Sequence, residues 1–146
     1  MSFNYSLQKI LDLKSNEKTQ AEWHLSEAIA ELSNEENDLC RLYSEMTAIQ
    51  ETLLNDTQNS STISNLLLIQ QYLEHLEQLI INKNKGIAAS KNNVENKQQN
   101  LSSKMLDEKV WVKAKEKAYQ KFSSDISRKD QNELDEIAST QHGLKE

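Results

Sequence analysis

The chain contains no proline, only two glycines and only one cysteine, and aromatic residues make up 5% of it. Because most turns use proline or glycine, their scarcity excludes a meander of short strands and a loop-rich enzyme. The single cysteine, Cys40, cannot form an internal disulfide, which is typical of a reducing compartment. No apolar run approaches the roughly 20 residues that cross a bilayer, so we expect neither a transmembrane segment nor a secretory signal.

The residues that remain are mostly polar and favour helices. Leu, Glu, Lys, Gln and Ala are abundant, and only 36% of the 146 residues are apolar. This composition suits a narrow stripe of apolar residues between paired helices, which we call the seam, better than a thick globular core. The formal net charge of −6 argues against generic nucleic-acid binding.

Apolar residues recur at alternating steps of three and four from Leu7 to Leu53. Eleven of the fourteen positions in this series are apolar, which is typical of a coiled-coil helix. We predict a helix over about residues 4–54. The full series is Leu7, Leu11, Lys14, Lys18, Ala21, Leu25, Ala28, Leu32, Glu35, Leu39, Leu42, Met46, Ile49 and Leu53.

A polar stretch at about residues 55–62 predicts the one turn. Ser60, Ser61 or Thr62 can cap the second helix, which we expect over about residues 63–140. Its apolar series up to Leu101 is Leu66, Ile69, Leu73, Leu76, Ile80, Ile87, Val94 and Leu101. Beyond Leu101 the apolar residues fall at Met105, Val112, Tyr119 and Ile126. This phase shift predicts a four-residue insertion in the repeat, called a stutter.

We therefore predict an all-α fold: a long antiparallel two-helix coiled-coil hairpin, forming a single domain over residues 1–146. The first helix would be roughly 75 Å long, and partner residue numbers would add to about 117. Leu11 would then face the region of Leu106. Residues beyond about 113 would have no partner, leaving a C-terminal helical overhang. Because an isolated helix is marginal in water, the overhang is expected to bind another protein.

Charge is unevenly distributed along the chain. Residues 1–60 hold 11 acidic and 4 basic side chains, whereas residues 83–121 hold 10 lysines and 4 acidic residues. Antiparallel pairing brings these opposite charges together, although each exposed pair contributes only about a few tenths of a kcal/mol.

No pattern for catalysis or metal binding is present. The histidines are His24, His75 and His142, and none has Glu three residues before it, as the Glu-x-x-His pairs of di-iron bundles do. Zinc-protease, phosphate-loop and nucleophile-elbow motifs are also absent from the sequence. We expect a non-enzymatic protein without a cofactor or metal.

The start of the second helix has more apolar residues than a seam needs. Leu67, Leu68, Tyr72, Leu79 and Ile81 all lie outside the seam series. They either broaden the seam or form a docking patch for another protein. Both interpretations remain open at this point.

Three stretches together resemble the FliJ family of flagellar export proteins. They are the opening residues 3–14, the segment 69–80 (IQQYLEHLEQLI) and the closing segment 128–138 (RKDQNELDEIA). The length and the predicted hairpin also match over essentially the whole chain. The resemblance implies a cytoplasmic component of the flagellar type III secretion apparatus, needed for flagellum biogenesis and motility.

The resemblance also implies partners and site residues. Members of this family are the central stalk of the hexameric export ATPase, link it to the gate protein FlhA and escort export chaperones. They would be attached to the cytoplasmic face of the inner membrane through the export complex. No nucleic-acid partner is implied. The implied gate-binding residues are Leu42, Ile49, Tyr72 and Leu76. The implied ATPase-binding residues, by analogy with the stalk, are Phe3, Leu7, Leu11, Tyr119, Ile126, Leu134 and Ile137.

Three other interpretations are open. The first is the equivalent stalk of a virulence injectisome, which would have the same shape. The second is a purely structural coiled-coil tether, which would stimulate no ATPase. The third is a di-metal helical-bundle enzyme formed by dimerisation, against which the missing Glu-x-x-His argues.

Overall fold

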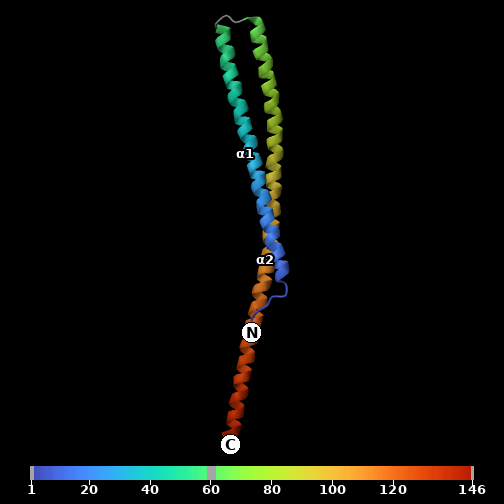
Figure 1. The fold of residues 1–146 in the computed structure, drawn as a ribbon, viewed down its shortest axis with the longest axis vertical. Helices are drawn as coiled ribbons and strands as arrows, with labels where there is room; N and C mark the ends of the chain where they lie inside the picture. The colour runs from blue at the N-terminus through green and yellow to red at the C-terminus, as the bar shows by residue number, and fades with distance from the viewer. Residues whose placement is uncertain (1, 59–61, 146) are drawn as a thin grey trace. The chain divides into compact units, whose positions relative to one another are not determined.

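The computed structural model describes residues 2–58 and 62–145, and these form two helices, α1 (Gln8–Gln58) and α2 (Ile63–Lys145), with no strand among them (Figure 1). The two helices pack against each other in antiparallel orientation. The predicted all-α helical hairpin is confirmed. Its contacts divide into two units, which we describe separately: unit 1 comprises Met1–Gln20 and Ser102–Glu146, and unit 2 comprises Ala21–Leu101.

The helix boundaries differ from those expected by about one turn. α1 begins at Gln8, whose amide donates to the Tyr5 carbonyl at 3.1 Å, and it continues through residues 55–58 that were assigned to the turn. At the start of α2 the Asn65 amide donates to Thr62 Oγ1 at 3.2 Å. Thr62 is therefore the N-cap, while the other two candidates, Ser60 and Ser61, lie outside the described residues.

The core of unit 2 is the predicted seam. Its buried residues are Ala21 and Ala28 on α1 and Leu73, Leu76, Ile80 and Ile87 on α2. Leu76 is the most enclosed, with 1% of its surface exposed. The remaining seam positions of unit 2 are half-buried, including the polar Glu35 and Lys83. The coiled-coil spacing thus accounts for burial at polar as well as apolar positions.

In unit 1 the seam of α2 continues at the same spacing of three and four, and the predicted stutter after Leu101 is wrong. The half-buried positions include Lys104, Glu108, Trp111, Lys115, Ala118 and Phe122. Met105, Val112 and Tyr119 are instead 37–54% exposed and flank the seam. The sequence-based series followed these flanking residues because they are apolar, whereas charged residues occupy several of the actual seam positions.

The pairing register also differs from that expected in unit 1. In unit 2 Glu45 pairs with Tyr72, which agrees with the expected register. In unit 1 Lys14 pairs with Asp107 and Lys104 with Glu17, about one turn further along α2 than expected. These ion pairs mark the shifted register of unit 1.

The fully exposed part of α2 begins later than residue 113, beyond which no partner was expected. Phe3 contacts Tyr119 and Phe122, and Ile126 is half-buried. From residue 127 to residue 143 every side chain is exposed. This stretch is the C-terminal helical overhang of unit 1.

Candidate partner-binding surfaces

An open groove of about 560 Å³ lies between α1 and α2 in unit 2. Its apolar part is formed by Leu42 and Leu79, and charged side chains surround them. We call it the Leu79 groove. Its complete lining is Glu35, Asp38, Arg41, Leu42, Glu45, Leu79, Asn82 and Lys83.

Lys83 crosses the seam at one end of the groove. Its Nζ lies 3.3 Å from Glu35 Oε2 and 3.4 Å from Asp38 Oδ2. The hydrogen bond from Lys83 to Glu35, followed by that to Asp38, raises the pKa of the ammonium group. Asp38 also accepts a hydrogen bond from Arg41, and this bond is the first cause of its lowered pKa. The charges at this end of the groove are therefore largely neutralised by one another.

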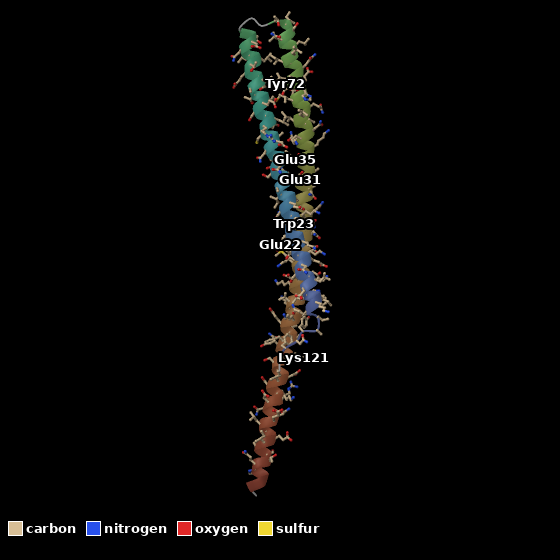
Figure 2. All side chains as sticks on the ribbon, in the orientation of Figure 1. Glu22, Trp23, Glu31, Glu35, Tyr72 and Lys121 are labelled. Atoms are coloured by element: carbon tan, nitrogen blue, oxygen red, sulfur yellow. The ribbon has the colours of Figure 1, made fainter. Side chains whose placement is uncertain are left out.

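Tyr72 links the two helices at the other end of the groove. Its hydroxyl donates a hydrogen bond to the carboxylate of Glu45, and this bond raises the pKa of Tyr72. The ring also lies 6.3 Å from His75, one turn further along α2. Tyr72 remains 40% exposed, so its ring can still contact another molecule (Figure 2).

The structure places the four predicted gate-binding residues in different environments. Leu42 lines the Leu79 groove, and Tyr72 lies beside it through Glu45. Ile49 is half-buried in the seam. Leu76 is enclosed between the helices, so it can be reached only if α1 and α2 separate.

A cluster of aromatic rings lies in unit 1, where the segment before α1 folds onto α2. The Phe3 ring centroid is 5.2 Å from Tyr119, edge to face, and 5.3 Å from Phe122. Tyr5 stacks on Phe3 at 6.3 Å. Such aromatic pairs add about 0.5–1.5 kcal/mol beyond burial. They explain why residues 2–7 do not extend α1.

Five of the seven predicted ATPase-binding residues form two groups within unit 1, and Leu7 and Leu11 belong to neither group. Phe3, Tyr119 and Ile126 lie at or beside the aromatic cluster, whereas Leu134 and Ile137 are 61% and 55% exposed on the overhang. Leu7 is 40% exposed. Leu11, with 7% of its surface exposed, is a core residue.

Charged side chains replace apolar ones in the seam of unit 1. Lys14 lies 2.9 Å from Asp107 and Lys18 lies 3.2 Å from Glu108. Lys104 approaches Glu17 at 3.5 Å. The hydrogen bond to Asp107 raises the pKa of Lys14, whereas hydrogen bonds from Ser15 and then Lys18 lower the pKa of Glu108. This ionic seam joins α1 to α2 with little apolar burial.

Two kinds of feature are absent from residues 2–58 and 62–145. These residues contain no group of three or more His, Cys, Asp or Glu side chains placed to hold a metal ion. They also contain no helix long and apolar enough to cross a membrane.

Sequence reasoning missed the charged lining of the Leu79 groove. A signal for it was available, because Asp38 and Glu45 are seven residues apart on α1, as Tyr72 and Leu79 are on α2. In an antiparallel coiled coil such flanking rows meet along one side of the seam. The position of Lys83 in the heptad series would then have placed its ammonium group beside these acids.

Comparison with known proteins agrees with this architecture. The sequence model of the family described as "Flagellar FliJ protein" matches residues 3–146. A curated relative, the Flagellar FliJ protein of Bacillus subtilis (strain 168), is 23% identical over 141 residues, covering 97% of this chain and 96% of the relative. Among solved structures, the YscO homologue CT670 from Chlamydia trachomatis has a TM-score of 0.74 at 18% identity, covering 98% and 97% of the two chains. The last likeness concerns the fold alone.

Proposed function

The chain belongs to the FliJ family, and on that premise we propose that it is a non-enzymatic stalk of the flagellar type III export apparatus. In this role it binds the hexameric export ATPase, links it to the gate protein FlhA and escorts export chaperones. The observation that supports the proposal is that the chain has two different exposed surfaces with apolar side chains, each of which could bind another protein. One is the Leu79 groove of unit 2, and the other is the exposed apolar overhang of unit 1.

The Leu79 groove is the proposed gate-binding site. It combines an apolar floor of Leu42 and Leu79 with the amphipathic ring of Tyr72, which supplies contact area at low entropic cost. Leu76 and Ile49 support this surface from beneath as seam residues. A partner segment can therefore bind without opening the hairpin.

The overhang is the proposed ATPase-binding site, together with the aromatic cluster beside it. Leu134 and Ile137 are 61% and 55% exposed, within a stretch of α2 whose side chains are exposed throughout residues 127–143. A single helix with exposed apolar side chains gains stability when a partner buries them. One asymmetric stalk also cannot contact six equivalent subunits in the same way, so it would favour different states in different subunits.

Co-purification with the ATPase and with the cytosolic part of FlhA tests the two sites. The double substitution Tyr72→Ala with Leu79→Ala should abolish gate binding and leave ATPase binding intact. Leu134→Ala with Ile137→Ala should do the reverse. The matched control is Leu67→Ala with Ile81→Ala, which removes leucine and isoleucine side chains of similar exposure outside the groove.

ATPase turnover gives a second test. The full chain should stimulate turnover, and a chain truncated after Lys121 should not. Equal stimulation by both chains would exclude the overhang as the ATPase contact. Absence of any stimulation, with neither partner retained, would instead favour a purely structural tether.

A further inference from the structure

Four lysines of α2 in unit 1 follow one another at four-residue steps. They are Lys109, Lys113, Lys117 and Lys121, which we call the lysine row. All four are exposed, and none forms an ion pair with any residue that the structure describes (Lys121 is labelled in Figure 2). Three seam lysines of the same unit, Lys14, Lys18 and Lys104, are by contrast paired with acidic residues.

The lysine row is a local concentration of positive charge, since residues 109–121 hold five lysines and one acidic residue. Like charges four residues apart on a helix repel each other and weaken it. The nearby acids Asp107 and Glu108 are already paired with Lys14 and Lys18. Glu116 is the one acidic residue within residues 109–121, so this stretch keeps a net positive charge that is suited to an external anion.

Two aliphatic side chains are interspersed with the lysine row. Leu106 is 66% exposed and Val110 is 64% exposed, and they precede Lys109 and Lys113 by three residues each. Residues three apart on a helix lie on the same side. The half-buried seam residues Glu108 and Trp111 face α1. Leucine, valine and lysines therefore share the solvent side of α2.

We propose that this side of α2 binds the surface of an anionic lipid bilayer. Leu106 and Val110 would enter the interface, while the lysines extend their ammonium groups to the lipid phosphates. Clusters of four or more basic side chains on an amphipathic helix are typical of such binding. The contact is direct and differs from attachment through the export complex.

The geometry favours a bilayer over an acidic helix or a nucleic acid. Each four-residue step turns about 40° past a full helical turn, so the lysine row spans an arc of about 120°. A layer of mobile headgroups can follow so broad an arc, whereas one partner helix contacts a narrow stripe. A nucleic-acid backbone would give Leu106 and Val110 nothing apolar to contact.

The proposed ATPase contact lies on other surfaces of unit 1. Tyr119 and Phe122 contact Phe3, and Leu134 and Ile137 lie on the overhang. Lipid binding can therefore be measured with the full chain and vesicles alone. Its outcome does not depend on the export partners.

Vesicle flotation tests the proposal. The full chain should bind vesicles of phosphatidylcholine with about a quarter phosphatidylglycerol, should not bind phosphatidylcholine alone, and should detach as salt is raised. Changing all four lysines of the row to Gln should reduce partitioning at least about tenfold. The corresponding change to Arg should retain it.

The matched control removes the same charge elsewhere. Lys9, Lys85, Lys91 and Lys129 are also exposed lysines, and changing them to Gln should leave partitioning close to wild type. An equal loss in this control would overturn the proposal, since net charge alone would then explain binding. Circular dichroism of each variant confirms that it is folded.

The aliphatic residues give a second, charge-neutral test. Leu106→Ser with Val110→Ser should weaken binding to the anionic vesicles several-fold. Leu67→Ser with Leu68→Ser, at comparable exposure in unit 2, should not. Failure of the wild-type chain to bind anionic vesicles would also overturn the proposal, as would binding to an acidic polypeptide or DNA in preference to them.

Discussion

The hydroxyl of Tyr72 on α2 donates a hydrogen bond to the carboxylate of Glu45 on α1. This bond joins the two helices beside the Leu79 groove and holds the tyrosine ring against one wall of it. It also stabilises the protonated phenol next to a negative charge, which raises the pKa of Tyr72. The proposed gate-binding ring is therefore positioned by an acidic neighbour on the other helix.

The first prediction follows from that hydrogen bond. Because the pKa is raised in the fold, the stabilisation is complete below pH about 10 and is lost as pH rises through the higher folded value. A tyrosinate absorbance titration should show one of the four tyrosines ionising later than the others. The lag should disappear in Glu45→Gln, whereas Glu51→Gln should leave it unchanged.

The burial of Leu76 predicts a stability defect that is independent of partner binding. Leu76→Ala should lower the free energy of unfolding by about 2–4 kcal/mol, because it leaves a cavity between the helices. Leu79→Ala, at a position 37% exposed, should cost less than about 1 kcal/mol. Urea denaturation followed by circular dichroism measures both. Equal costs would contradict the placement of Leu76 in the core.

Gly86 predicts a stabilising substitution. It lies inside α2, and a Cβ there would lie 3.2 Å from the Oε2 atom of Glu35, the flexible end of a side chain. Gly86→Ala should therefore raise the free energy of unfolding by about 0.5–1 kcal/mol through helix propensity. Gly143→Ala, which meets no atom within 4 Å near the end of α2, is the control and should change it little. Destabilisation by Gly86→Ala would indicate that Glu35 cannot move without losing Lys83.

The loss of folding stability at acidic pH should depend on Asp38 and Glu108. Arg41 lowers the pKa of Asp38, and Ser15 with Lys18 lowers the pKa of Glu108. Stabilisation by these carboxylates is present above their ordinary values of 3.8 and 4.5, and it is lost as pH falls through the lower folded values. Thermal melts between neutral pH and pH about 3 should show a smaller decline for Asp38→Asn or Glu108→Gln than for wild type. An unchanged slope would contradict these assignments.

The aromatic cluster predicts a local effect. Phe3→Ala should release residues 2–7 from α2 and accelerate amide exchange near Tyr119, with a global cost of about 1 kcal/mol or less. Hydrogen exchange followed by mass spectrometry measures this region by region. A uniform change across both helices would show that Phe3 supports more than its own segment.

The sequence predicted the seam well wherever seam residues are apolar. The series from Leu11 to Leu53 on α1 is buried or half-buried at every position, and Thr62 caps α2 as one of three candidates. The prediction failed after Leu101 because Lys104, Glu108 and Lys115 occupy seam positions that an apolar count passes over. Lys104 and Glu108 occupy seam positions where they pair with residues on α1. The apolar pattern of α2 alone gives no information about those partners.

The candidate sites divide in the same way. Exposure of Leu134 and Ile137 follows from the absence of a helix opposite them, which the unequal helix lengths already indicated. Leu76 belongs to the predicted seam series, so its burial could be predicted from spacing alone. The Leu79 groove could not, since it depends on how long charged side chains such as Lys83 and Asp38 meet across two helices.

The ionic seam of unit 1 has a consequence for reversibility. When helices joined by leucines come apart, they expose surface that aggregates, whereas Lys14, Lys18 and Glu108 are readily hydrated. The stretch of α1 and α2 that these ion pairs join can therefore separate and rejoin while exposing mainly charged side chains. Higher ionic strength weakens these ion pairs and therefore favours their separation, whereas it hardly affects the leucine-lined seam of unit 2.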